Sequence, residues 1–164
     1  MEALKPSTTA PDFRLAKVGG GEFSLGHALT QGPVVAVFFK ISCPVCQFVL
    51  PYVQRLYEGV RDNAATIIAI SQNDENLTKL FMREYSLSLP VLLDDERTYA
   101  VSNAYGLTNV PTMFYIGQGG DIQQTVVGWD RKEMENVIGR LSSANVATTT
   151  VFKPGESVPD FKAG

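Results

Sequence analysis

Two cysteines lie three residues apart in the stretch Cys43-Pro44-Val45-Cys46, and the chain contains no others. This spacing lets both sulfurs meet within the first turn of a helix, as redox-active cysteine pairs do. An inert disulfide is the simplest alternative, but so short a loop would add little stability. A zinc site would have only His27 as a further ligand and falls short of a closed four-ligand site. The pattern favours a redox pair and no metal.

The residues around the pair place Cys43 at the start of a helix. The run 34–39 is short, β-branched and aromatic, as in a buried strand, and apolar residues after Cys46 recur with helical spacing. Cys43 then lies at the N-cap and Pro44 at the first helical position, where a missing N–H costs nothing. The N–H groups of Val45 and Cys46 and the helix dipole favour the thiolate of Cys43. Cys46, one turn deeper, is predicted to be the resolving thiol.

Composition limits the partners of the protein. The 164 residues fit one domain, 45% of them are hydrophobic, and the net charge is −3 with no basic run. Nucleic acid and anionic membranes are therefore poor partners, and no apolar run is long enough to span a membrane. The N-terminus lacks a hydrophobic signal core, so we expect a cytoplasmic protein, or an exported one whose leader was removed. The sequence leaves the oligomeric state open.

Strand and helix patterns alternate along the chain. The expected elements are a hairpin (13–15 and 23–25), a helical turn (26–30), strands at 34–39, 66–70, 89–93, 113–116 and 122–127, and helices after Cys43, after Asp74, after Glu96 and from about 131 to 141. Strands separated by helices imply parallel crossovers, and the last hairpin adds antiparallel strands. We therefore expect a mixed sheet with helices on both faces and Cys43 at its carboxyl edge.

Some local expectations concern burial and capping. The helix after Asp74 should bury Leu77, Leu80, Phe81 and Tyr85, and the helix capped by residues 94–96 should bury Ala100, Val101 and Ala104. Asp130 and Glu133 fit a capping box, and Trp129 is predicted to be a packed surface residue.

The end of the chain repeats a pattern from its beginning. Lys153–Phe161 matches Lys5–Phe13 at the lysine, both prolines, the aspartate and the phenylalanine. We expect a tail in which Phe161 docks in a groove as Phe13 does. A truncated tandem domain, or a segment that pairs with another subunit, is the alternative.

Four stretches together resemble the thioredoxin superfamily, in particular its TlpA/ResA-like branch, which is related to the AhpC/TSA redoxins. They are Pro11-Asp12-Phe13, Phe38 to Cys46 with Pro51 beyond, Leu89 to Asp94, and Val110-Pro111-Thr112. The resemblance runs from Pro11 to Leu141 and implies a thioredoxin-like three-layer α/β/α sandwich. This fold has a mixed central sheet, an N-terminal β-hairpin and, at 89–94, a TlpA-type insertion. The chain then divides into a flexible segment (1–10), the domain (11–142) and a tail (143–164).

The resemblance also implies a site built from two loops. Pro111 is cis in this family and packs against the cysteine pair, which leaves the peptide edge of Val110, followed by Thr112, to bind an extended substrate. No cofactor is expected beyond the redox-active disulfide. Ser42 replaces the usual tryptophan before the first cysteine, and the familiar carboxylate positions are Val37 and Val49. Lys40 is expected either to favour the Cys43 thiolate through its charge or to be solvated.

Three functions fit these residues. The first is a thiol–disulfide oxidoreductase that acts on protein thiols and disulfides, with a dithiol reductase or oxidase as partner. The second is a peroxiredoxin-like thiol peroxidase, but peroxiredoxins carry threonine or serine at the position of Lys40. The third is a redox-regulated binding module.

Overall fold

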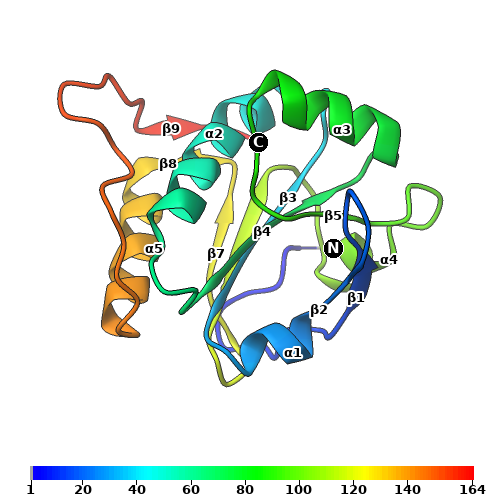
Figure 1. Cartoon of the computed structure of the whole chain (residues 1–164), viewed down its shortest axis with the longest axis horizontal. Coiled ribbons are helices and arrows are strands. Elements are labelled where there is room, and N and C mark those ends of the chain that lie inside the picture. The colour runs from blue at the N-terminus through cyan, green and yellow to red at the C-terminus, as the bar shows by residue number, and fades with distance from the viewer. Residues whose placement is uncertain (1) are drawn as a thin grey trace.

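The computed structural model describes residues 2–164 as one α/β domain (Figure 1). The elements are β1 (Arg14–Ala16), β2 (Glu22–Ser24), α1 (Leu25–Leu29), β3 (Val34–Phe39), α2 (Pro44–Gly59), β4 (Thr66–Ser71), α3 (Glu75–Glu84), β5 (Val91–Leu93), α4 (Ala100–Ala104), β6 (Thr112–Ile116), β7 (Ile122–Val127), β8 (Trp129–Asp130), α5 (Arg131–Ser143) and β9 (Phe161–Lys162). The predicted N-terminal hairpin is confirmed as the antiparallel pair β1–β2.

The central sheet has the strand order β5-β4-β3-β6-β7. Strands β3, β4 and β5 run parallel, while β6 and β7 add two antiparallel strands. The predicted mixed sheet is therefore confirmed. Because β3 and β4 are parallel neighbours, their carboxyl ends meet at one edge, where Phe39 pairs with Ser71.

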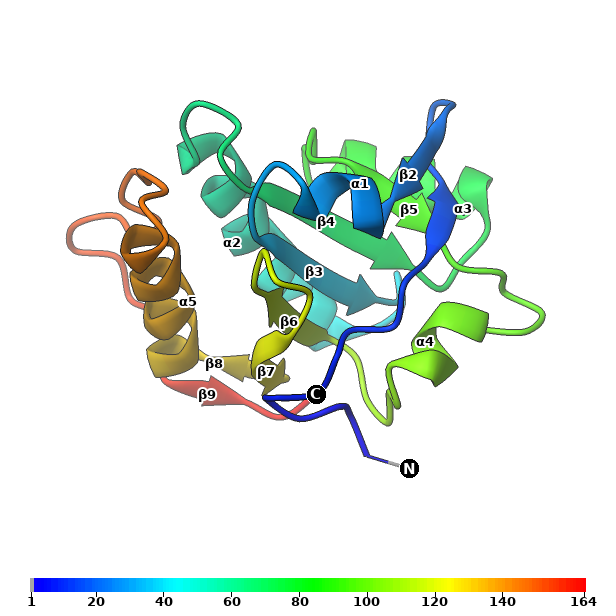
Figure 2. The same ribbon diagram turned by 90° about the horizontal axis from the view of Figure 1, so that it is seen from below.

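Helices cover both faces of the sheet, as the three-layer prediction requires (Figure 2). Side chains of β3 alternate between two apolar cores, since successive residues of a strand point to opposite faces. Val35, Val37 and Phe39 pack with residues of α2, α3 and α5. Val34, Ala36 and Phe38 pack with residues of α1 and of the segment 101–105. All six side chains are fully buried, so β3 forms the centre of the domain.

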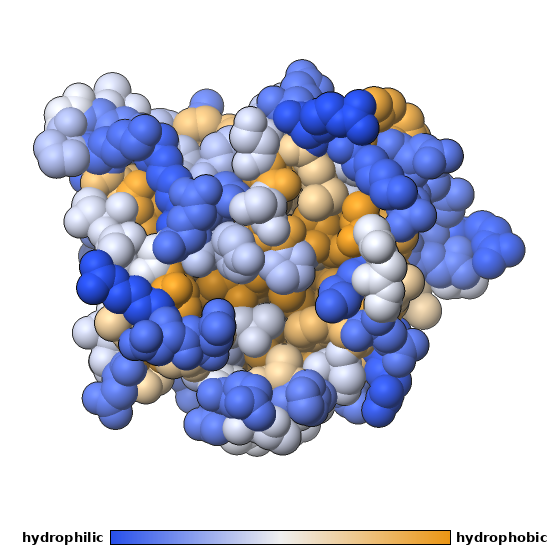
Figure 3. Space-filling model, in the orientation of Figure 1, coloured by the Kyte–Doolittle hydropathy of each residue, from blue (hydrophilic) through white to orange (hydrophobic). Residues whose placement is uncertain are grey.

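The predicted inner face of α3 is partly wrong. Leu77 and Leu80 are 42% and 56% exposed, whereas Thr78 and Phe81 are buried. The Thr78 hydroxyl lies 2.7 Å from Ser71 Oγ at the end of β4 and donates to the Asp74 carbonyl. The contact with Ser71 holds the Thr78 side of α3 against the sheet, and Leu77 and Leu80 face solvent. Figure 3 shows apolar residues in the middle of this face of the molecule, surrounded mostly by hydrophilic residues.

The predicted buried face of α4 needs correction, whereas its predicted capping by Asp94 is confirmed. The helix begins after Tyr99, which has left-handed backbone geometry and makes no side-chain cap. Ser102 is the buried residue of this helix, and Ala100 and Ala104 are exposed. Asp94 caps the helix although it lies five residues before Tyr99, because its buried carboxylate accepts bonds from the N–H groups of Val101 and Ser102.

Trp129 is buried rather than placed on the surface, with 2% of its area exposed. Its ring packs on Phe48 and Tyr52 of α2, with centroids 5.2 and 4.9 Å away, and on Phe152 of the tail. Its Nε1–H donates to the Pro159 carbonyl at 2.7 Å. The tail covers the indole, which is why the prediction of a surface residue failed.

Both terminal segments pack on the domain. The amides of Leu4 and Ser7 donate to the carbonyls of Tyr105 and Ile122, and β9 pairs antiparallel with β8. Arg55 of α2 donates to both carboxylate oxygens of Glu156 at 2.8 and 2.9 Å. The division of the chain at residues 10 and 142 stays a prediction.

Phe161 does not dock as Phe13 does, although the two stand in matching sequence patterns. Phe13 is 7% exposed and packs on Phe23 and Tyr105, whereas Phe161 is 62% exposed. As part of β9, Phe161 alternates with Lys162, whose Nζ lies 5.1 Å from the centroid of the Phe48 ring. Strand pairing therefore turns Lys162 inward and Phe161 outward.

Candidate active site

Cys43 is held between β3 and α2, as predicted. It is the N-cap residue of α2, with extended backbone angles of φ −86° and ψ 116°, and Pro44 occupies the first turn. The N–H of Cys46 donates to Cys43 Sγ at 3.1 Å. An amide that points at the sulfur, together with the positive end of the helix, stabilises a negative charge there.

The loop before Cys43 is fixed by hydrogen bonds to its neighbours. The Ile41 N–H donates to Asn73 Oδ1 at 3.0 Å, and the Gln47 side chain donates to the Ile41 carbonyl at 2.9 Å. Ser42 and Pro44, on either side of Cys43, are exposed. Cys43 itself is half-buried, whereas Cys46 is fully buried.

Cys46 lies deeper in the domain. Its side chain is fully buried among core residues, and both cysteines are free thiols. Burial raises the pKa of the Cys46 thiol well above its ordinary value, and the hydrogen bond with Cys43 adds to this effect. The two sulfurs are therefore unequal in exposure, with Cys43 outside and Cys46 inside. Val45, between them, is half-buried against the core.

The second predicted loop faces the first. The Val110–Pro111 peptide bond is cis, as the resemblance implies. Cys43 Sγ lies 3.5 Å from the Val110 carbonyl oxygen and donates to it. Pro111 and Thr112 are buried, and the Thr112 hydroxyl donates to the Asn109 carbonyl at 2.8 Å, which braces the turn. The structure thus brings Cys43, Cys46 and the Val110–Thr112 loop together.

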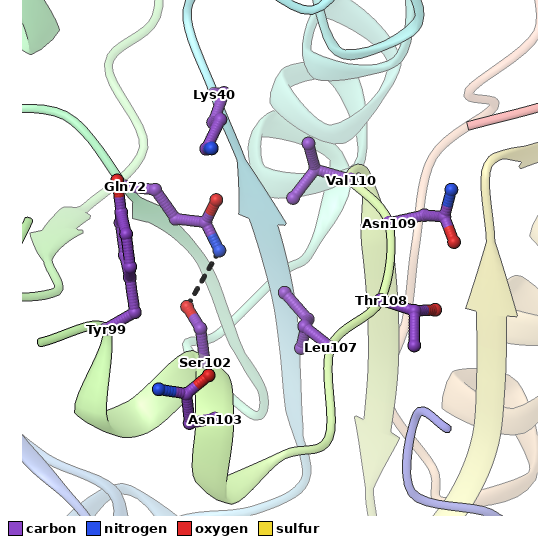
Figure 4. Close-up of a pocket in the computed structure, with 9 residues that line it drawn as sticks. All are labelled: Lys40, Gln72, Tyr99, Ser102, Asn103, Leu107, Thr108, Asn109 and Val110. Atoms are coloured by element: carbon purple, nitrogen blue, oxygen red, sulfur yellow. Dashed lines mark hydrogen bonds between the residues drawn. The ribbon is translucent and has the colours of Figure 1, made fainter. Parts of the chain in front are cut away.

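A cavity of about 230 Å³ opens next to this loop (Figure 4). Its lining comprises Lys40, Gln72, Tyr99, Ser102, Asn103, Leu107, Thr108, Asn109 and Val110. Lys40 and Val110 are predicted site residues, whereas Gln72, Tyr99 and Ser102 are not among the predicted ones. Gln72 directly follows the carboxyl end of β4, the parallel neighbour of β3, and this position is the signal that could have found it.

The tail reaches the site from the other side. Asn109 Nδ2 donates to the Gly164 carbonyl at 3.2 Å, and a Cβ added at Gly164 would lie 3.0 Å from the Val110 carbonyl oxygen. Gly128 makes this approach possible, because it has a φ of +79° and an added Cβ would lie 2.5 Å from the Lys162 oxygen. The sequence predicts residues 143–164 as a tail outside the domain, but the end of this tail flanks Val110.

Across residues 2–164, no cluster of three or more histidine, cysteine or carboxylate side chains is arranged to hold a metal ion. The same stretch contains no helix with the length and apolar character of a membrane span.

The fold and the paired thiols define a thioredoxin-like protein, and comparisons with known proteins extend this result. Residues 6–125 match the AhpC/TSA family. The thiol-disulfide oxidoreductase ResA of Geobacillus kaustophilus is 30% identical over 132 residues, which cover 80% of this chain and 74% of that protein. ResA of Bacillus subtilis is 27% identical over 128 residues, 77% of this chain and 70% of that protein.

A solved structure shows the same fold. The thioredoxin domain of a thiol-disulfide oxidoreductase from Bacteroides vulgatus has a TM-score of 0.74 at 19% identity, and the match covers 85% of this chain and 99% of that one. The chain belongs to the AhpC/TSA family. Within it, the ResA relatives and the adjacent thiols Cys43 and Cys46 make it a thiol–disulfide oxidoreductase.

Proposed function

We propose that Cys43 is the nucleophile and Cys46 the resolving cysteine, and that the substrates are disulfides in polypeptides. The observation that carries the proposal is the unequal exposure of the two sulfurs. Cys43 is half-buried and its Sγ accepts a bond from the Cys46 amide, whereas Cys46 is buried with a raised pKa. A nucleophile must reach its partner, and the resolving thiol needs only to reach the first sulfur.

The reaction balances as two thiol–disulfide exchanges. The Cys43 thiolate attacks one sulfur of the substrate disulfide, a mixed disulfide forms, and the other substrate sulfur leaves as a thiolate. Cys46 then loses its proton and attacks Cys43 Sγ, which releases the second substrate thiol and leaves a Cys43–Cys46 disulfide. The substrate gains two electrons and two protons, and a dithiol partner must reduce the enzyme again. In the reverse direction the same steps oxidise a substrate dithiol.

The loop opposite Cys43 offers a place for the substrate backbone. Val110 lies against Cys43 Sγ and contributes a carbonyl oxygen that an extended chain can reach, and Pro111 and Thr112 hold it in position. Pairing with an exposed peptide edge is a common mode of recognition for extended polypeptides. We expect Val110 to be the point at which the substrate chain crosses the site.

The test uses two cysteine variants with insulin and an excess of a dithiol reductant. Cys43→Ser should abolish reduction, whereas pre-reduced Cys46→Ser mixed with insulin without the dithiol should accumulate a covalent complex that the dithiol then releases. Activity that survives in Cys43→Ser would refute the assignment. A control with hydrogen peroxide in place of insulin separates disulfide reduction from peroxidase activity, because a peroxidase would consume peroxide stoichiometrically.

A further inference from the structure

The cavity beside Cys43 carries one charged group. Of its nine lining residues, Lys40 alone is ionised at neutral pH. Val110 connects the cavity to the reacting sulfur, because its carbonyl oxygen contacts Cys43 Sγ while its side chain points into the cavity (Figure 4). A substrate residue close to the reacting disulfide can therefore enter this space.

Gln72 and Ser102 form a polar part of the cavity lining, and hydrogen bonds fix the orientation of both side chains. The Ser102 hydroxyl donates its one hydrogen to Asp94 Oδ2 at 2.7 Å, so it can only accept the bond from Gln72 Nε2 at 2.9 Å. The Gln72 amide oxygen consequently points away from Ser102, toward the side of the cavity where Lys40 lies (Figure 4). Asp94 accepts from two backbone amides as well as from Ser102. Its charge is therefore already stabilised by bonds that do not involve Lys40.

Lys40 lines the cavity on the side opposite Ser102 (Figure 4). Its Nζ lies 5.4 Å from the centroid of the Tyr99 ring, a distance at which the ring attracts the cation. Lys40 forms no ion pair with any other residue in the range 2–164. The ammonium group thus keeps its charge available, and a cavity with one uncompensated cation attracts anions.

We propose that this cavity binds the carboxylate of an acidic residue that flanks the reacting disulfide of a polypeptide substrate, with Lys40 as its partner. The proposal rests on the proposed function and names a substrate class for it. The carboxylate contacts Lys40 from the side away from the Gln72 amide oxygen, because that oxygen repels a negative group. The aliphatic part of a glutamate side chain packs against Leu107 and Val110.

A second effect of Lys40 must be separated from this one. An influence of Lys40 on the reactivity of the sulfur itself would change the rate for every substrate by the same factor. The ratio of rates for an acidic and a neutral substrate removes this shared factor. The ratio therefore reports on the cavity alone.

The experiment uses short fluorogenic disulfide peptides in matched pairs, with glutamate or glutamine placed one or two residues before or after the cysteine. The kcat/KM for each is measured with the wild-type chain and with Lys40→Met, Lys40→Arg and Lys132→Met. Lys132 is an exposed residue of α5, so Lys132→Met makes the same change in net charge away from the cavity.

For at least one placement, the wild-type chain should favour glutamate over glutamine by about twofold to fivefold, the range of one accessible ion pair. Lys40→Met should bring this ratio to one, whereas Lys40→Arg and Lys132→Met should retain it. Equal rates for glutamate and glutamine at every placement, or a preference that Lys40→Met retains, would overturn the inference. A wild-type chain that reduces none of the peptides would instead contradict the proposed function.

Discussion

The buried thiol of Cys46 predicts a specific dependence of stability on pH in the reduced protein. Burial raises the pKa of this thiol above its ordinary value of 9.0. Above pH 9.0 the unfolded chain therefore loses a proton that the native state keeps, and the native state binds more protons than the unfolded one. The stability from this group is complete below pH 9.0 and is lost as pH rises toward the folded pKa.

The size of the effect follows from the linkage relation. One proton of difference between the two states changes the free energy of unfolding by about 1.4 kcal/mol per pH unit. The reduced chain should therefore lose about 1.4 kcal/mol at pH 10 relative to a variant without the thiol, and more above it. Tyr105 also has a raised pKa because it is buried, but this contribution is common to both proteins and cancels in the comparison.

The assay is urea unfolding of the reduced wild-type chain and of Cys46→Ala between about pH 8 and about pH 10.5, where the thiol of the unfolded chain titrates. The difference between the two free energies of unfolding should shrink or change sign as pH rises. The oxidised wild-type protein is a second control, because its disulfide has no proton to lose. Free-energy curves of reduced wild type and Cys46→Ala that stay parallel across this range would refute the reasoning.

Two other predictions concern the packing around α2. Glu156→Gln removes the ion pair with Arg55 and should make the tail more sensitive to limited proteolysis, while a thermal melt of the domain changes little. Arg55 holds the pKa of Glu156 below its ordinary value of 4.5, so acidification below pH 4.5 protonates Glu156 and weakens the ion pair. Cleavage of the wild-type tail by an acid-active protease should then increase, while cleavage of the variant stays unchanged. Equal sensitivity of the two proteins at all pH values would contradict this. Leu50→Ala, at a fully buried position of α2, should lower the free energy of unfolding by about 2–5 kcal/mol in a urea titration. A loss below about 1 kcal/mol would show that the core around Leu50 closes over the missing side chain.

Much of the fold was predictable because the sequence patterns are unambiguous. The run 34–39 has no polar residue, and a strand buried on both faces has this pattern. The cysteine pair and Val110-Pro111-Thr112 lie far apart in the chain, and only the resemblance to a known family indicated that they meet. Contacts between distant loops depend on the sheet order, which local patterns do not specify.

The failures share one physical cause, which is that long-range contacts decide burial. Leu77 and Leu80 lie on an apolar stripe, but the bond between Thr78 and Ser71 at the end of β4 holds the other side of α3 against the sheet. Trp129 was expected on the surface because its cover, Pro159, comes thirty residues later. Phe161 repeats the context of Phe13, yet the partner strand β8 decides which side chain of β9 faces inward.

The way the terminal segments and the first hairpin pack has a consequence for association between molecules. Lys17 and Val18 bond to the outer side of β5, while Ser7 and Ala10 bond to residues 120–122 beside β7. Unpaired strand edges invite edge-to-edge aggregation. A protein that handles extended chains would be especially prone to it, and here short stretches of its own backbone occupy parts of both outer strands.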